Sequence, residues 1–480
     1  IALHDLRDET AEALADRLRK HYPSLDVRLA GNDPAGYDLV VNGTPLGTER
    51  TVVHPAELRQ ADGADPLLYC RRNLAGNPAL VRKHRTLNMD RDTAIKMAQH
   101  AIKAKNKRLV DAVLQIRAER EKLPAADVPV AELPLIAVTC ATGWECYAVV
   151  EELTRTLKYR VRALYRTPGT QAAARLEALF KKTEASHPGL LSLHAGVDMN
   201  SAEKLTAAFA GCAGVVLYVT ANTSKAGKIT NHGNDPAGGR AAVMRQVLAA
   251  LGALRANPSV THVITLVFPP DKVHGIVDGA PEAPWWIHQR LRISDFLRGQ
   301  GVNVTCIHRP AYYYAMHRVD YTLQAQIRGD TKLSKTMIRE NNIPGINEPG
   351  FLVNWVDVRD VGKWAGTCFE YPEVFSNQDF SIASCALTGN QLVEIAERTN
   401  KHGTKFKYKQ FPQWLMKMIS FFSEEVVYPL RYAQWYNDQT NGYDFACDAD
   451  LADLERIHPR WTFEKKLESW GITAIRPKAS

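Results

Sequence analysis

The residues best placed for chemistry lie in a short turn between an apolar run and a helical stretch. Residues 135–138 read Leu-Ile-Ala-Val, and residues 139–146 continue as Thr-Cys-Ala-Thr-Gly-Trp-Glu-Cys. A glycine in such a turn lets the backbone approach a pyrophosphate, and the first amides of the following helix bind its oxygens. The turn therefore predicts a dinucleotide site with these candidate ligands: Thr139, Cys140, Thr142, Gly143, Trp144 and Glu145.

Three further candidate cofactor ligands follow the next strands of the same pattern. Arg166 comes after the second predicted strand, Asp198 comes after the third, and Thr220 ends the fourth. An arginine at the end of the second strand pairs with a 2′-phosphate, which an acidic residue would repel, so Arg166 favours NADP over NAD. An ordinary surface arginine is the alternative interpretation of Arg166.

These turns belong to a regular alternation of strands and helices. The predicted strands are 135–139, 160–164, 190–193, 214–220 and 261–268, and the predicted helices between the first four are 147–156, 171–186 and 202–209. Such alternation predicts right-handed βαβ units and a doubly wound α/β fold with a parallel sheet. The switch point of this sheet falls after Thr139, where such folds bind their ligands.

Several ordered motifs resemble those of the NmrA-like and isoflavone-reductase-like atypical short-chain dehydrogenases. The turn at 139–146 is similar to their T-G-A-T-G-x-x-G loop, and "VRALYRTP" is similar to their second strand. Other similar stretches are "GVDMNSAEKLTAAFAGCAGVVLYVT", "IHRPAYYYAM", "NWVDVRDVGKWA" and "NGYDFACDADLADLERIHPRWTFEKKLESWG". The resemblance implies a Rossmann-fold NADP-binding domain at 133–480, with a substrate or partner subdomain at about 306–480. It also implies that Asp198 contacts adenine.

Two cysteines depart from the loop of that family. Cys140 and Cys146 stand where the first and third glycines would be. A Cβ at 140 is expected to strain the turn, and a Cβ at 146 is expected to push the helix away from the strand, which would reduce nucleotide affinity. A redox-active pair is the weaker alternative to simple replacement by small residues, because disulfide geometry is demanding.

The catalytic groups of short-chain dehydrogenases are replaced. These enzymes use a serine, a tyrosine that donates a proton, and a lysine four residues further on that lowers the tyrosine pKa. The serine position falls at the strand end near Val267, and Trp286 and Arg290 stand where the tyrosine and lysine would be. Arg290 matches the lysine that NmrA-like members often keep alone, and an arginine can bind the nicotinamide ribose or a phosphate. His288 and tyrosines 312–314 are further proton donors to consider, although core packing explains the tyrosines better. Arg290 and His288 are thus the candidate catalytic residues, and Arg290 is also a candidate cofactor ligand.

The first 65 residues are predicted to form a separate partial α/β unit with a parallel sheet, in which strands at 1–4, 27–29 and 37–41 alternate with a helix at 9–21. "DLVVNGTPLG" at 38–47 resembles the fourth-strand loop of shikimate/quinate dehydrogenases, and "LHDLRDE" resembles the end of the second strand in their NAD-using members. Asp5 follows a strand, where a carboxylate can accept ribose hydroxyls. The glycine-rich first turn of that family is not in the chain, so we predict that residues 1–65 bind no dinucleotide and have a packing role.

Length, composition and charge indicate how the rest of the chain is organised. A chain of 480 residues, 45% hydrophobic and 23% charged, is expected to fold into two or three domains. A basic helical connector and linker at 66–132 is predicted between the partial unit at 1–65 and the domain at 133–480. Residues 82–122 contain 12 Lys or Arg against 5 Asp or Glu, and so carry most of the net charge of +8. Because no aromatic residue alternates with these cations, a solvated helix with an apolar stripe is favoured over a nucleic-acid site.

The cysteines and the hydropathy indicate the environment of the chain. Eight scattered cysteines with no C-x-x-C pair or Cys/His cluster favour free thiols in a reducing compartment and argue against a zinc site. A mean hydropathy of -0.27 fits a soluble chain without a transmembrane helix. No targeting segment is visible, and the abrupt start at Ile1 within a predicted strand indicates a trimmed N-terminus. The compartment therefore stays open.

Three functions stay open from the sequence. The first is an NADP-dependent reductase of a small apolar or aromatic substrate, with weak or altered catalysis. The second is a non-catalytic NADP(H) sensor, and the third is a structural subunit of a larger assembly. A section rich in Trp and Met between Trp414 and Tyr436 would be a lid over such a substrate, a surface for a protein partner, or simply core.

Overall fold

The computed structural model describes residues 2–3, 28–29, 40–42, 51–53, 91–122, 128–220, 223–225, 228–230, 236–267, 285–312, 341–345, 347–410, 412, 414, 417–418 and 451–469. The chain divides into two compact units. One consists of Ile1–Ala101 with Lys272–Ala280, and the other consists of Ile102–Asp271 with Pro281–Ser480. The domain boundaries given above remain predictions.

The described strands of the first unit form two short pairs. β1 (Ala2–Leu3) runs parallel to β2 (Arg28–Leu29), in line with the predicted strand–helix–strand order; the helix at 9–21 and Asp5 lie outside the described residues. β3 (Val40–Asn42) instead pairs antiparallel with β4 (Thr51–Val53). This pair corrects the all-parallel arrangement predicted for residues 1–65, because a short connection returns the chain antiparallel whereas a parallel strand needs a long crossover.

The second unit is built around a seven-stranded parallel sheet. Its order is β16-β12-β11-β8-β5-β6-β7, and every neighbouring pair is parallel. The strands are β5 (Leu135–Val138), β6 (Arg160–Leu164), β7 (Leu191–His194), β8 (Gly214–Leu217), β11 (His262–Val267), β12 (Val304–His308) and β16 (Asp379–Ser381). The chain crosses to the opposite side after β7, so β5 lies at the switch point, as the sequence predicts.

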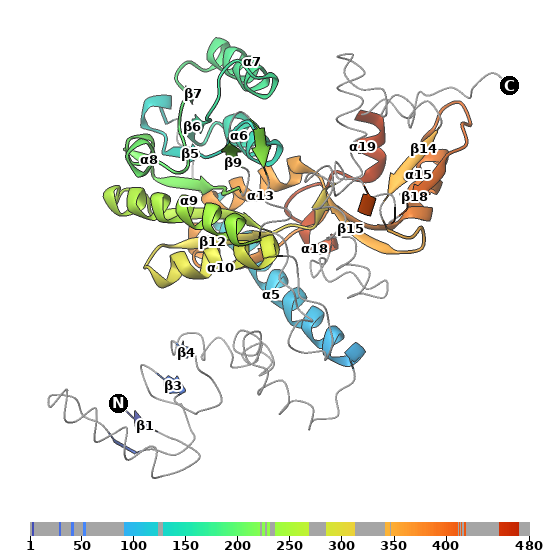
Figure 1. Ribbon diagram of the computed structural model, residues 1–480, viewed down its shortest axis with the longest axis horizontal. Coiled ribbons are helices and arrows are strands. Elements are labelled where there is room, and N and C mark those ends of the chain that lie inside the picture. The colour runs from blue at the N-terminus through green and yellow to red at the C-terminus, as the bar shows by residue number, and fades with distance from the viewer. Residues whose placement is uncertain are drawn as a thin grey trace. The chain divides into compact units, whose positions relative to one another are not determined.

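Helices cover both faces of this sheet, as Figure 1 shows. One core cluster joins the sheet to α5 (Arg91–Arg120), α6 (Trp144–Thr156), α7 (Gln171–Ser186) and α13 (Val358–Glu370). A second joins the other face to α8 (Ala202–Phe209), α9 (Pro236–Ala256) and α10 (Trp285–Gly299). α6 and α13 pack closely because Gly362 has no side chain; a Cβ there would lie 2.5 Å from the carbonyl oxygen of Ala148.

The second half of α5 seals the edge of the sheet. Val110 and Val113 are fully buried, which confirms the predicted apolar stripe where the side chains of α5 are described, whereas Lys107 is exposed. The Asn106 side chain donates to the carbonyl of Ser381 at 2.6 Å and accepts from its amide at 3.2 Å. These bonds satisfy backbone groups of β16, which would otherwise be open at the sheet edge.

The C-terminal part adds smaller sheets around a third core cluster. β15 (Leu352–Val356) pairs with β13 (Ala311–Tyr312) and β17 (Cys385–Thr388), and β14 (Asn342–Gly345) pairs with β18 (Lys407–Gln410). Phe351, Trp355, Phe406 and Phe463 form much of that cluster. The remaining elements are η2 (Val130–Glu132), β9 (Thr223–Lys225), β10 (Lys228–Thr230), α14 (Pro372–Phe375), α15 (Gly389–Thr399), α18 (Leu451–Glu455) and α19 (Phe463–Ser469).

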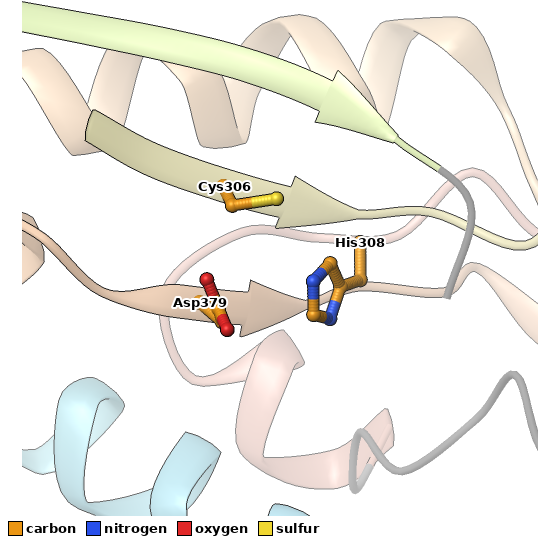
Figure 2. Close-up of side chains that lie close together, drawn as sticks. All are labelled: Cys306, His308 and Asp379. Carbon is orange, nitrogen blue, oxygen red and sulfur yellow. The ribbon is translucent and has the colours of Figure 1, made fainter. Parts of the chain in front are cut away.

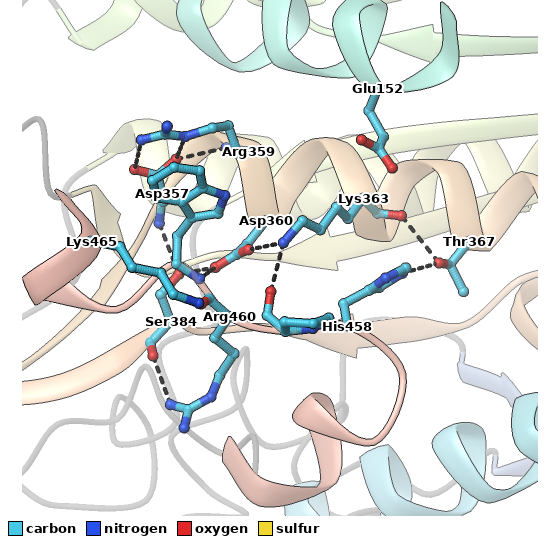
Figure 3. Close-up of polar contacts among 12 residues, drawn as sticks. Glu152, Asp357, Arg359, Asp360, Lys363, Thr367, Ser384, His458, Arg460 and Lys465 are labelled. Atoms are coloured by element: carbon cyan, nitrogen blue, oxygen red, sulfur yellow. Dashed lines mark hydrogen bonds and ion pairs between the residues drawn. The ribbon is translucent and has the colours of Figure 1, made fainter. Parts of the chain in front are cut away.

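Two buried carboxylates at the start of α13 tie the C-terminal segment to the main sheet (Figure 3). Asp357 pairs with Arg359 at 2.8 Å and with Lys466 at 3.1 Å. Burial opposes ionisation, but the bonds from Arg359 and the charge of Lys466 bring the pKa of Asp357 below its usual value. Asp360 accepts hydrogen bonds from Ser384 Oγ at 2.5 Å and from the amide of Trp461 at 2.9 Å. Nearly every polar group of this joint is therefore satisfied inside the protein.

Candidate functional site

The turn after β5 is anchored by Thr139. This residue is fully buried, and its hydroxyl donates to the carbonyl of Val216 at 3.1 Å and accepts from the amide of Tyr218 at 2.8 Å. Both partners lie on or just after β8, the neighbour of β5 across the switch point. Thr139 therefore positions the turn, and its hydroxyl is engaged in the fold.

Cys140 takes the backbone conformation that a glycine would take. Its φ angle is +51°, in the left-handed region, and its Sγ lies 3.5 Å from the carbonyl oxygen of Tyr218. Cys140 thus holds a left-handed conformation although it has a side chain. This φ angle agrees with the predicted strain at position 140, since a left-handed non-glycine residue costs roughly 1–2 kcal/mol. None of the cysteines that the structure describes, Cys140 and Cys146 included, is part of a disulfide.

The start of α6 carries no side-chain cap. Gly143 is the N-cap residue with φ −69° and ψ 150°, it is exposed, and it offers no hydrogen-bond acceptor of its own to the helix. A Cβ at this position would lie 3.2 Å from the carbonyl oxygen of Cys140. A helix start without a cap has backbone amides to offer to an anion, and the helix dipole favours negative charge there.

A cation that the sequence analysis did not single out lies beside this turn. The guanidinium carbon of Arg175, on α7, is 3.9 Å from the ring centre of Trp144 and 4.1 Å from that of Tyr147. Arg175 also donates to the carbonyl of Thr142 at 3.1 Å. Burial raises the pKa of Tyr147, the charge of Glu151 adds to the rise, and Arg175 opposes it. In the sequence, the only signal for this contact was the position of Arg175 near the start of the predicted helix at 171–186.

The three predicted ligands on the later strands lie in different environments. Arg166 is exposed directly after β6, and across the described parts of the chain its guanidinium forms no hydrogen bond or ion pair. The Asp198 carboxylate accepts from both the amide and the side chain of Asn200 at 3.0 Å, so it shapes its own turn. Thr220 is fixed by Gln246 of α9, which bonds both its amide and its carbonyl. The exposed guanidinium of Arg166 thus differs from Asp198 and Thr220, whose polar groups are bonded within the fold.

Glu145 is committed to an interior partner. Its Oε1 accepts a hydrogen bond from Nη2 of Arg309 at 2.7 Å, and the two side chains are only 7% and 1% exposed. A buried carboxylate needs such a partner because an unpaired charge in the core is very costly. The backbone amide of Glu145, rather than its side chain, is therefore the group to consider for a phosphate.

The catalytic positions are described only in part. Val267 ends β11 as a buried apolar residue, so no hydroxyl stands at the serine position. Trp286, His288 and Arg290 belong to α10, and their side chains lie outside the described residues. The structure therefore does not bring the two predicted catalytic side chains to the turn or place them away from it.

One cluster corrects the expectation that no cysteine and histidine lie together. Cys306 and His308 on β12 lie close to Asp379 on β16 (Figure 2). Burial, with the negative charge of Asp379, raises the pKa of the Cys306 thiol to about 12. The sequence signal was the Cys-x-His spacing on one strand, which places both side chains on the same face.

The fold and the turn together define a class of protein. A doubly wound parallel sheet, with a glycine-containing turn and an uncapped helix at its switch point, is the architecture of Rossmann-fold proteins. The chain belongs to the NmrA-like family, whose model matches residues 133–465. This result confirms the family resemblance of the region from Leu133 onward. The resemblance of the first segment to shikimate/quinate dehydrogenases stays a prediction.

Several solved structures resemble the chain at low sequence identity. Triphenylmethane reductase from Citrobacter sp., complexed with NADP(H), has 16% identity and a TM-score of 0.48, covering 70% of this chain and 99% of that chain. NmrA, a negative transcriptional regulator in complex with NADP, has 15% identity and a TM-score of 0.46, with coverages of 70% and 94%. Leucoanthocyanidin reductase from Vitis vinifera, in a binary complex with NADPH, has 14% identity and a TM-score of 0.48, with coverages of 70% and 99%. These values are too low to carry a conclusion about cofactor or activity.

Two further findings concern related sequences and membrane-spanning helices. No curated protein sequence matches the chain. Among the helices that the structure describes, none combines the length and the apolar character needed to cross a membrane.

Proposed function

We propose that the domain at 133–480 binds NADP(H) and prefers it to NAD(H). The observation that carries this proposal is the exposed guanidinium of Arg166 directly after β6, at the same sheet edge as the uncapped start of α6. The helix start suits a pyrophosphate, and the arginine suits a 2′-phosphate, the group that distinguishes NADP from NAD. Membership of the NmrA-like family supports the proposal.

Arg175 supports the same preference. Its guanidinium lies over the rings of Trp144 and Tyr147 and donates to the carbonyl of Thr142, so its charge has a fixed position beside the turn after β5. A second cation at this edge strengthens the attraction of a ligand that carries three phosphate groups rather than two.

The chemistry that follows binding is proposed to be weak or absent. Val267 offers no hydroxyl where the serine of short-chain dehydrogenases would hold a carbonyl, and Trp286 has no transferable proton at the tyrosine position. These replacements favour an NADP(H)-binding sensor. A reductase of a small apolar or aromatic substrate is the second candidate, because Arg290 still matches the lysine position and His288 lies nearby on α10.

The test is a comparison of NADPH and NADH binding to the purified full chain, followed by nucleotide fluorescence. One charge-assisted hydrogen bond corresponds to about 1.5–3 kcal/mol, so we expect NADPH to bind at least about tenfold more tightly than NADH. Arg166→Asp should remove that preference, whereas Lys181→Asp, the same charge change at an exposed position of α7, should keep it. Equal affinity of the unmodified chain for both nucleotides would refute the proposal.

A further inference from the structure

Three potential metal ligands meet on one face of the sheet at its β16 edge. Cys306 and His308 are two residues apart on β12, so their side chains point to the same face. Asp379 of β16 is the direct parallel partner of Cys306 and therefore shares that face. The sulfur, one imidazole nitrogen and one carboxylate oxygen lie within 4.8 Å of one another (Figure 2).

We propose that Cys306, His308 and Asp379 bind one Zn²⁺ ion, with water as the fourth ligand. A thiolate, an imidazole and a carboxylate form a mixed S, N and O set that suits Zn²⁺, whereas Mg²⁺ and Ca²⁺ prefer oxygen ligands alone. Zinc coordinates four ligands in a tetrahedron, and three ligand atoms this close together need only small side-chain rotations to surround one ion.

The surroundings of the cluster fit an oriented ligand set. Arg298 of α10 donates to Asp379 Oδ1 at 2.7 Å and to the carbonyls of Val304 and Gln378 at 2.9 and 3.1 Å. Carboxylates that bind metals usually accept such an outer hydrogen bond, which fixes their orientation. The charge of Arg298 also opposes the incoming cation, so the expected affinity is lower than that of a Cys-rich structural site.

Burial and access are both compatible with an ion at this position. Cys306 is 1% exposed and His308 is 6% exposed, so two of the ligands are shielded from water. The side chain of Asp379 is 26% exposed, which gives the ion a path from solvent. Because Asn106 docks on Ser381 of the same strand, an ion between β12 and β16 would fasten the edge that holds α5.

The first experiment uses the unmodified full chain, stripped with a chelator and then titrated with Co²⁺. Cobalt takes zinc sites and gives a thiolate-to-metal charge-transfer band when a cysteine is bound. We expect one Co²⁺ per chain with this band, displacement by one Zn²⁺, and a rise in the unfolding temperature on adding Zn²⁺. A folded chain that shows neither the band nor a zinc-dependent rise in unfolding temperature would overturn the proposal.

The second experiment locates the ion with variants. Cys306→Ser should abolish the charge-transfer band, and Asp379→Asn should weaken Co²⁺ binding at least about tenfold, since loss of even an outer partner typically costs 10–100-fold. Cys212→Ser changes another buried cysteine of the same sheet domain and should leave the titration unchanged. Far-ultraviolet circular dichroism checks that each variant folds. If Cys306→Ser or Asp379→Asn does not fold, His308→Gln is tested in its place and should also weaken Co²⁺ binding. A band that persists in folded Cys306→Ser would place the ion elsewhere and refute this site.

Discussion

Arg309 and Glu145 form an ion pair in the interior, with 2.7 Å between Nη2 and Oε1 and side-chain exposures of 1% and 7%. Glu145 lies in the first turn of α6, and Arg309 directly follows β12, so the pair joins the helix of the proposed nucleotide site to a strand near the sheet edge. The carboxylate is also favoured by the positive end of the α6 dipole. Two sets of contacts therefore hold the turn: the hydrogen bonds of Thr139 to Val216 and Tyr218, on and just after β8, and this ion pair.

Removing only one partner of this ion pair should strongly destabilise the protein. Arg309→Met leaves a buried carboxylate without its main partner, and we expect a loss of about 3–5 kcal/mol in the free energy of unfolding. The double variant Arg309→Met with Glu145→Leu should recover most of that loss, because no buried charge then remains. Urea unfolding at neutral pH measures both.

An exposed pair supplies the matched control for this experiment. Lys122 and Glu119 are each 67% exposed and 2.8 Å apart, so Lys122→Met should cost less than about 1 kcal/mol. A similar small loss in Arg309→Met would contradict the assigned role of the buried pair. A double variant no more stable than the single one would point to packing instead of charge.

Cys140→Gly should stabilise the protein slightly. Relief of the left-handed conformation gains roughly 1–2 kcal/mol. The greater freedom of glycine in the unfolded chain offsets about 0.5–1 kcal/mol of that gain. Cys140→Val should be clearly destabilising, because a β-branched residue is poorly tolerated at a φ of +51°. Thermal or urea unfolding measures the stability of the two variants. A Cys140→Val variant as stable as Cys140→Gly would show that the backbone at position 140 is not strained.

The partly buried His458 at the C-terminal joint predicts a loss of stability in acid. His458 bonds the hydroxyl of Thr367 at 2.6 Å, and burial, followed by the charges of Lys363, Arg117 and Arg155, lowers its pKa from 6.5 to about 3. The unfolded chain takes up a proton below about pH 6.5 and the folded chain does so only near pH 3. Stability should therefore fall as pH decreases from 6.5 to 3, by up to about 1.4 kcal/mol per pH unit.

The contribution of His458 can be separated from that of the other groups that titrate in acid. His458→Gln can keep a hydrogen bond to Thr367 but cannot be protonated, so its stability should depend less steeply on pH between 6.5 and 3. His402→Gln changes an exposed histidine and should follow the unmodified protein. If the free energy of unfolding depends on pH equally steeply in all three proteins, His458 is excluded as the source of that dependence.

Much of the fold could be predicted because the signals are local. Strands β5, β8 and β11 are mainly apolar runs that lie within the predicted ranges, although β8 ends at Leu217, before the predicted residue 220. Strand β6 and helix α8 span the predicted residues 160–164 and 202–209. The parallel sheet and its switch point after Thr139 followed from the alternation of strands and helices, since parallel strands need crossovers of fixed hand. The apolar stripe of α5 was also visible, although its docking on β16 was not.

The contacts that could not be predicted join residues far apart in the chain. Asp379 meets Cys306 only because β16 is added beside β12 at the edge of the sheet, and nothing local specifies that pairing. Arg309 forms a buried ion pair with Glu145, which lies 164 residues earlier in the chain. Arg175 of α7 lies over the ring of Trp144, which belongs to α6. Sequence patterns fix which face a side chain takes, whereas the neighbour across an interface depends on the whole packing.

Arg290 provides the sharpest test of what the proposed site does with a nucleotide. Its fixed charge and forked donors suit ribose or phosphate oxygens, and it is not a usable acid near neutral pH. Arg290→Met should weaken NADPH binding by roughly 1.5–3 kcal/mol, the range for a hydrogen bond to a charged group. Arg290→Lys should keep much of the binding, yet gain no activity while Trp286 stands at the tyrosine position. Nucleotide titration with fluorescence measures both variants.

The double change Trp286→Tyr with Arg290→Lys then asks whether a reductase can be restored. Loss of a positioned general acid typically costs about 10²–10⁴-fold in rate, so returning the tyrosine and the lysine should give slow carbonyl reduction. Val267 limits the gain, because no hydroxyl stands at the serine position to hold the carbonyl. NADPH consumption with a panel of small aromatic carbonyl compounds follows the reaction, and Arg290→Met is the control. If the unmodified protein reduces such compounds rapidly and Arg290→Met does so equally well, Arg290 has no binding role and another acid acts, with His288 the first to change.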